Sequence, residues 1–281
     1  MASNPAVAYN PDQRFRITVR DMEYRDGLAV RLYIPEGTGP FPALVDVHGG
    51  VWSLNDYTAN ETMNRELAGS GIVIAAVNFR QPPEHPYPAQ VVDVNFAIRW
   101  LKSKATDFNA DPETVGGMGG SSGGHTIILS SMRPSHPSYN AIELPGSDAD
   151  ATLRYVIVGW PIVAPYERYI YAQETGNDRL VELTDAYFSS AEAMNEGSPY
   201  QILKRGEAEV LPPLFIAQGT ADTNLPVPVT EQFAKDYRAL GGDVELQLFQ
   251  DMPHNFANVP GPESDIAVAV SYTHLTLPTK A

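Results

Sequence analysis

Short runs of β-branched and apolar residues alternate along the chain with longer amphipathic stretches, and this alternation constrains the fold more than any other feature. The pattern is typical of a mostly parallel sheet with helices on both faces. Two further runs, separated by the turn-forming pair Asp26-Gly27, predict an antiparallel hairpin near the start of the chain, which makes eight strands in total. The predicted strands are residues 16–20, 28–34, 43–47, 72–77, 114–118, 155–158, 214–217 and 244–249, and the predicted helices are residues 58–68, 89–102, 122–132 and 228–240.

Composition narrows the classes of partner. The chain of 281 residues has no cysteine, and 34 acidic against 19 basic residues give a net charge of -15. Such a charge repels phosphate backbones and anionic headgroups, so neither nucleic acid nor a membrane is expected as a partner. No run of eighteen apolar residues occurs, and residues 1–15 lack the basic start and apolar core of a signal peptide. We therefore expect a disulfide-free protein of the cytoplasm.

One interval, residues 160–211, interrupts the alternation. It contains no run typical of a buried strand, but it is enriched in tyrosine, phenylalanine and tryptophan. An insertion between two strands of an open α/β sheet is typical of a lid over the carboxyl edge, where such sheets bind ligands. The alternative interpretation is that its aromatic residues only anchor the insertion to the main body.

A glycine-rich segment at residues 114–125 joins a predicted strand to a predicted helix. A sharp strand-to-helix turn lifts a serine hydroxyl out of the sheet edge, and it needs glycine two residues to either side. The Gly-x-Ser-x-Gly pattern fits Ser121, between Gly119 and Gly123, and it also fits Ser122. Spacing alone therefore leaves two candidate nucleophiles, and a glycine-rich turn without chemistry is the alternative.

The segment His48-Gly49-Gly50-Val51-Trp52 follows the first predicted parallel strand. Adjacent glycines let the main chain approach a substrate carbonyl closely, so the N–H groups of Gly50 and Val51 are candidate oxyanion donors. We expect His48 to fix the loop geometry through a hydrogen bond. Alone, the motif is also compatible with a simple turn in which Trp52 is a packing residue.

An activated serine needs a base and a group that orients the base. His254 follows the last predicted strand and Asp222 follows the strand at 214–217, so both are expected at the same sheet edge as the serine. The chain order Ser, Asp, His is that of the α/β-hydrolase arrangement. Asp251 is a rival acid, but it lies only three residues before His254 and is predicted to be a turn residue. The histidines form no metal-ligand cluster, so no metal site is predicted.

With these motifs the chain resembles the α/β-hydrolase fold carboxylesterases, in particular the hormone-sensitive-lipase-like branch that carries His-Gly-Gly-x-Trp, over about residues 21–270. Residues 78–89 are similar to the segment of that branch written Tyr-Arg-Leu-Ala-Pro-Glu with a following Pro-Ala. The longer elbow pattern Gly-x-Ser-x-Gly-Gly-His places the nucleophile at Ser121. The resemblance also implies that the N–H group of Ser122 completes the oxyanion hole.

The resemblance implies a serine hydrolase that cleaves carboxylic esters through an acyl-enzyme, without cofactor or metal. The aromatic lid suggests small-to-medium apolar or aryl esters as the small-molecule substrate, and a homo-oligomer is compatible with the sequence. An arylformamidase or other amidase would share the same motifs. A prolyl-oligopeptidase-like peptidase is disfavoured because 47 residues before His48 leave no room for a propeller. From another class, a non-catalytic hydrolase fold that binds small molecules would be expected to lack one of the three catalytic residues.

Two parts of the single predicted domain, residues 1–281, depart from the family pattern. Asp46 lies inside an otherwise apolar strand, where a buried carboxylate needs a partner that the sequence does not name. Residues 262–270 begin an amphipathic helix, but residues 271–281 abandon its period and resemble a translated sequencing adapter. We expect this non-native-looking tail to be poorly packed.

Overall fold

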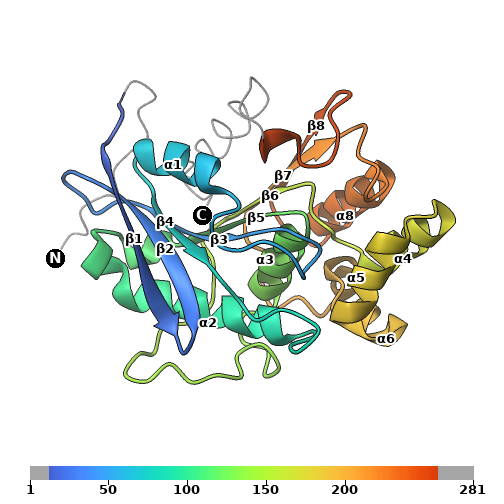
Figure 1. The fold of residues 1–281 in the computed structure, drawn as a ribbon, viewed down its shortest axis with the longest axis horizontal. Coiled ribbons are helices and arrows are strands. Elements are labelled where there is room, and N and C mark those ends of the chain that lie inside the picture. Colours follow the sequence, from blue (N-terminus) through green and yellow to red (C-terminus); the bar gives the residue numbers. More distant parts are fainter. Residues whose placement is uncertain (1–12, 259–281) are drawn as a thin grey trace.

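A computed structural model describes residues 13–258, and in it eight strands form one sheet (Figure 1). The strand order is β1-β2-β4-β3-β5-β6-β7-β8, in which β2 runs antiparallel to β1 and β4 and all other neighbours are parallel. The predicted mostly parallel, eight-stranded α/β fold is therefore confirmed. The strands are β1 Ile17–Arg25, β2 Leu28–Pro35, β3 Ala43–Val47, β4 Val73–Val77, β5 Gly116–Gly120, β6 Val156–Gly159, β7 Leu214–Gly219 and β8 Val244–Phe249.

The helices fall between these strands, with four of them in the interval between β6 and β7. They are α1 Glu61–Gly69, α2 Ala89–Lys104, α3 Ser122–Met132, α4 Pro165–Glu174, α5 Asp178–Phe188, α6 Ala191–Glu196, α7 Pro199–Arg205 and α8 Val227–Ala239, with short 3₁₀ turns at Ala105–Phe108, Pro112–Thr114 and Phe256–Asn258. The interval predicted as a lid thus holds α4 to α7, and Figure 1 shows α4, α5 and α6 grouped together at one side of the molecule. The helix expected at 262–270 and the tail at 271–281 lie outside the described residues.

Several predicted boundaries are wrong, and three of them have an identifiable local reason. The strand at 114–118 was placed two residues early, because the Asp111 side chain accepts the N–H of Glu113 and caps a 3₁₀ turn that includes Thr114. The helix at 58–68 begins only at Glu61, since the Asp56 carboxylate accepts the N–H of Thr58 at 2.8 Å and holds that residue in a turn. The first strand continues to Arg25, because its edge position tolerates polar residues.

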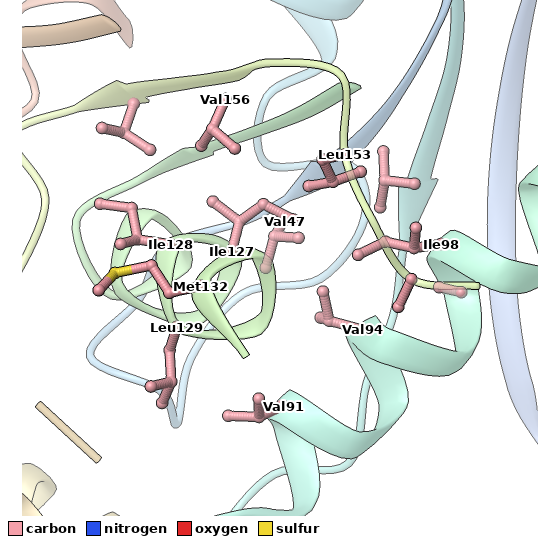
Figure 2. Packing of buried hydrophobic residues seen from close by; sticks show 14 of the residues in the cluster. Val47, Val91, Val94, Ile98, Ile127, Ile128, Leu129, Met132, Leu153 and Val156 are labelled. Atoms are coloured by element: carbon pink, nitrogen blue, oxygen red, sulfur yellow. The ribbon is translucent and has the colours of Figure 1, made fainter. Parts of the chain in front are cut away.

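The core lies on both faces of the sheet. On one face, α2 and α3 bring apolar side chains against the central strands, as Figure 2 shows for Val91, Val94, Ile127, Ile128 and their neighbours. On the other face, Leu67 of α1 belongs to a second cluster of buried hydrophobic residues, together with Leu44 of β3 and Ile74 of β4. Each fully buried aliphatic side chain contributes about 1.5–3 kcal/mol. This packing fixes the carboxyl ends of β3, β5, β7 and β8, from which the candidate site residues extend.

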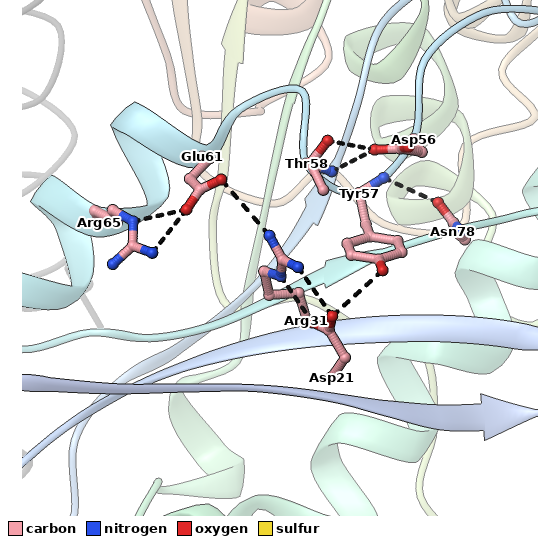
Figure 3. A network of polar contacts seen from close by, with 8 residues as sticks. All are labelled: Asp21, Arg31, Asp56, Tyr57, Thr58, Glu61, Arg65 and Asn78. Atoms are coloured by element: carbon pink, nitrogen blue, oxygen red, sulfur yellow. Dashed lines mark hydrogen bonds and ion pairs between the residues drawn. The ribbon is translucent and has the colours of Figure 1, made fainter.

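A polar network fastens the segment before α1 to the opening hairpin (Figure 3). Arg31 of β2 donates to both oxygens of Asp21, at 2.7 and 2.9 Å, and pairs with Glu61 at 3.6 Å. These contacts lower the pKa of the Asp21 carboxyl, chiefly through the hydrogen bond from Arg31. The side-chain oxygen of Asn78 accepts the N–H of Tyr57 at 2.9 Å. The loop after Trp52 is therefore anchored at its far end.

Candidate active site

Ser121 occupies the sharp turn between β5 and α3. Its backbone has φ 53° and ψ -121°, a conformation that costs energy for a residue with a side chain. A Cβ built on Gly119 would lie 2.6 Å from the carbonyl carbon of Gly123, so neither neighbour of this turn has room for a side chain. The predicted strand–serine–helix elbow is therefore present, with glycine where the backbone closes on itself.

The His48–Trp52 loop packs directly against this elbow. A Cβ on Gly123 would lie 2.0 Å from the carbonyl oxygen of Val47, and one on Gly49 would lie 2.8 Å from that of Gly120. Across the same contact, the N–H of Trp52 donates to the hydroxyl of Ser122 at 3.1 Å. The two motifs, about seventy residues apart in the sequence, are thus held together by main-chain contact.

Free N–H groups gather at this contact. The peptide N–H groups of Gly50, Val51 and Ser122 donate to no acceptor within residues 13–258, and Ser122 stands at the first position of α3, where helix N–H groups are unpaired. Val51 and Trp52 have φ of 52° and 60°, unusual values for such residues, which turn the loop toward the elbow. Such an arrangement can receive a negatively charged oxygen.

A line of hydrogen bonds joins Ser121, His254 and Asp222. Nε2 of His254 lies 2.9 Å from Oγ of Ser121, and Nδ1 lies 2.8 Å from Oδ2 of Asp222. Because the ionised carboxylate only accepts hydrogen bonds, Nδ1 carries the ring proton and Nε2 is free to accept the serine proton. The structure brings the hydroxyl of Ser121 to His254. Ser122 is only 1% exposed, and its hydroxyl accepts a hydrogen bond from the backbone N–H of Trp52.

Asp222 is prepared for this role by its surroundings. Burial works to raise its pKa, but hydrogen bonds from His254, the N–H of Asn224 and the Gln218 amide outweigh burial, and the pKa is lowered. The carboxyl group is therefore ionised at neutral pH. The rival Asp251 is exposed and accepts from Gln250, with no hydrogen bond to His254.

The remaining predicted loop residues have packing roles. His48 lies stacked on Phe79 at 4.3 Å, with Nδ1 2.9 Å from the carbonyl oxygen of Gly49, which agrees with the expected hydrogen bond. The indole N–H of Trp52 donates to Nδ1 of His125 at 3.1 Å, and its ring stacks on Tyr187. Tyr187 belongs to the insertion between β6 and β7 and is completely buried, so it anchors the insertion, as the alternative interpretation of the aromatic residues proposed.

Sequence reasoning missed the side chains that support the two loops. Gln90 donates to the carbonyl oxygen of Trp52, and Gln218 donates to Oδ2 of Asp222 at 2.7 Å. Both glutamines are at most 1% exposed. A buried glutamine is uncommon, and polar residues inside apolar stretches next to a motif are the signal that could have identified them.

The partners of Asp46 are one residue of α1 and the residue that precedes this helix. The carboxylate of Asp46 accepts from the amides of Asn60, at 2.9 Å, and Asn64, at 2.7 Å. Burial raises the pKa of Asp46 to about 6, although both amide hydrogen bonds act to lower it. The departure noted in the sequence is thus a buried carboxyl held by two amides, with no ion pair to it among the described residues.

Within residues 13–258, no group of three or more His, Cys, Asp or Glu side chains is arranged to hold a metal ion. In the same part of the chain, no helix has both the length and the apolar character to span a bilayer.

The fold and the site together define an α/β hydrolase. The sheet is mixed, a serine occupies the sharp turn after a strand, and hydrogen bonds join this serine, a histidine and an aspartate at the carboxyl edge of the sheet.

Comparison with known proteins agrees with this assignment to the α/β hydrolases. The chain belongs to the BD-FAE family, which matches residues 30–237, and this hormone-sensitive-lipase-like family confirms the resemblance stated from the sequence. Among relatives, the probable carboxylic ester hydrolase LipM of Mycobacterium tuberculosis is 24% identical over 72% of this chain and 46% of its own length. Esterase LipC of the same organism is 28% identical over 72% and 50%. The chain therefore spans about half the length of these relatives.

Solved structures share the fold. Esterase 2 of Thermogutta terrifontis phosphorylated by paraoxon has a TM-score of 0.70 and 23% sequence identity, over 91% of each chain. The butyrate-bound form of the same esterase has a TM-score of 0.73 and 23% identity, over 94% of this chain and 96% of that one.

Proposed function

We propose that this protein is a serine esterase that hydrolyses carboxylic esters of small molecules. The observation that carries the proposal is the continuous hydrogen-bonded line from Ser121 through His254 to Asp222, placed beside three unpaired N–H groups. Support comes from relatives named carboxylic ester hydrolase and esterase, and from a structural neighbour, an esterase whose structures are described as phosphorylated by paraoxon and as butyrate-bound.

The mechanism follows from the geometry. His254 Nε2 takes the proton of Ser121 as the hydroxyl oxygen attacks the ester carbonyl, and Asp222 keeps Nδ1 protonated and stabilises the imidazolium that forms. The N–H groups of Gly50, Val51 and Ser122 receive the negative charge on the carbonyl oxygen. The imidazolium then protonates the leaving alcohol, and His254 activates a water that cleaves the acyl-serine. Proton transfer and oxyanion stabilisation are thus both supplied by the chain.

The test compares the two serines. Ser121→Ala is expected to lower the rate of p-nitrophenyl butyrate hydrolysis by at least about 10³-fold and to abolish labelling by a fluorophosphonate, since the acyl-enzyme cannot form. Ser122→Ala is the matched control, because it removes an adjacent hydroxyl but keeps the backbone N–H. It is expected to retain labelling. The opposite outcome, loss of labelling with Ser122→Ala alone, would reject Ser121 as the nucleophile.

Three finer features remain proposals. Small-to-medium apolar or aryl esters are proposed as substrates, and a series of esters with increasing acyl length tests this preference. A parallel assay with an N-formyl arylamine distinguishes an esterase from the alternative, an amidase. A cytoplasmic location is a further proposal, which cell fractionation tests. A homo-oligomer stays a prediction, which light scattering can measure.

A further inference from the structure

A buried arginine of the lid lies between the two catalytic loops. Arg168 of α4 is 1% exposed, and its Nε donates to the side-chain oxygen of Asn224 at 3.0 Å. Nη1 donates to the hydroxyl of Thr184 on α5 at 2.9 Å. The guanidinium carbon lies 5.4 Å from the ring centre of Trp52. One side chain of the lid therefore contacts the loops that carry the oxyanion donors and the acid.

The contact with Asn224 leads directly to the acid. The N–H of Asn224 donates to Oδ1 of Asp222 at 2.7 Å, while Oδ2 of the same carboxylate binds His254. Fixing the side chain of Asn224 therefore fixes the peptide that orients Asp222. The cation acts through this hydrogen-bonded path, without itself touching the carboxylate or the serine.

The contact with Trp52 leads to the oxyanion donors. Trp52 follows Val51, and both residues have positive φ, so the loop needs external contacts to keep its shape. A guanidinium over an indole ring is attracted to the negative face of the ring, and this attraction is stronger when water is excluded. No carboxylate within residues 13–258 forms an ion pair with Arg168, so its side chain is held by the hydrogen bonds to Asn224 and Thr184 and by the ring of Trp52.

We propose that Arg168 is a positioning residue for ester hydrolysis, which holds the Asp222 loop through Asn224 and the oxyanion loop through Trp52. The insertion that contains α4 then has a role of its own, because it supplies the contact that positions both loops. This inference rests on the proposed esterase function.

The test exploits a matched arginine elsewhere in the chain. Arg99 of α2 is also buried, and its guanidinium lies over the ring of Phe96. Its Nε donates to the side-chain oxygen of Asn95 at 3.0 Å, and a second guanidinium nitrogen donates to a backbone carbonyl oxygen at 2.7 Å. Arg168→Gln and Arg99→Gln therefore lose equivalent contacts. Arg168→Gln is expected to lower kcat for p-nitrophenyl acetate about tenfold with KM within about twofold, since positioning acts on the transition state. Arg99→Gln is expected to keep kcat, with a similar fall in Tm.

A second variant isolates the path and does not depend on removing a buried charge. Asn224→Ala keeps the N–H that binds Asp222 but loses the acceptor for Arg168, so it should lower kcat in the same way. The double variant should be no worse than the more impaired single one, because the two residues act in series. Arg168→Lys, which keeps a cation, should recover part of kcat.

Three results would overturn the positioning role: an Arg168→Gln variant with unchanged kcat, equal losses with Arg168→Gln and Arg99→Gln, or additive losses with Asn224→Ala. If the Arg168→Gln protein does not fold, an unchanged kcat for Asn224→Ala overturns the role in the same way. A wild-type protein that neither hydrolyses esters nor takes up a fluorophosphonate would instead overturn the proposed function, and this inference with it.

Discussion

Replacing Asp46 with asparagine is expected to stabilise the protein at neutral pH. The carboxylate is 1% exposed and is held by the amides of Asn60 and Asn64 without a cation. Asparagine has the same shape without the charge. The side-chain oxygen of Asn64 is buried with no hydrogen-bond partner among the described residues, and after rotation of its amide it can accept from the new Asn side chain.

The magnitude follows from the pKa of Asp46, which burial raises from 3.8 to about 6. The folded protein therefore holds this proton more tightly than the unfolded chain. The corresponding contribution to the free energy of unfolding is fully present below pH 3.8 and is lost as the pH rises through about 6. Since a tenfold change in proton affinity equals about 1.4 kcal/mol, the loss amounts to roughly 3 kcal/mol at pH 8 and about half of that at pH 5.

Urea unfolding of both proteins from pH 5 to pH 8 measures this difference. Asp46→Asn should gain roughly 3 kcal/mol at pH 8, or about 5 °C in Tm for a domain of this size, and less at pH 5. Asp93→Asn is the control, because Asp93 is equally buried but pairs with Arg25 and Arg80. Removing the charge of Asp93 should destabilise the folded protein at both pH 5 and pH 8. If Asp46→Asn is less stable than the wild type at pH 8, the charged carboxylate is favourable and the reasoning fails.

Three further changes probe the elbow and the acid. Gly123→Ala places a Cβ 2.0 Å from the carbonyl oxygen of Val47, so it should lower Tm sharply or leave no folded protein, as circular dichroism would show; an unchanged melting curve would contradict the close approach. Gln218→Leu removes a donor to Asp222 and should lower kcat for p-nitrophenyl acetate about tenfold, whereas an equal kcat would assign Gln218 to packing alone. Asp251→Asn should keep kcat within about twofold, and a hundredfold loss would transfer the role of the acid to Asp251.

The strands and the three site residues could be predicted because their signals are local. The strands at 43–47 and 244–249 and the helix at 122–132 have the predicted bounds, since their apolar patterns are decided by burial alone. The acid and base follow their strands directly, so the common direction of parallel strands brings them to one edge.

The errors lie where side chains compete with the backbone pattern or come from distant elements. The hydrogen bonds accepted by Asp111 and Asp56 shifted two boundaries, because a carboxylate that accepts a nearby N–H gives no signal in hydrophobic periodicity. The packing of α1 brings Asn64 to Asp46, and the packing of α4 brings Arg168 to Asn224 beside Asp222. The sequence contains these residues, but no local spacing relates them to Asp46 or Asp222.

Strand β5 consists of four glycines and a methionine, and its neighbours use the space that side chains would fill. A Cβ on Gly116 would lie 2.1 Å from the ring of Tyr155, and one on Gly117 would lie 2.6 Å from Ile127. In a saturation mutagenesis screen these glycines should tolerate substitution as poorly as Ser121, although they take no part in chemistry. Intolerance at this strand would record the shape of the scaffold, and only an assay on folded variants would separate it from catalysis.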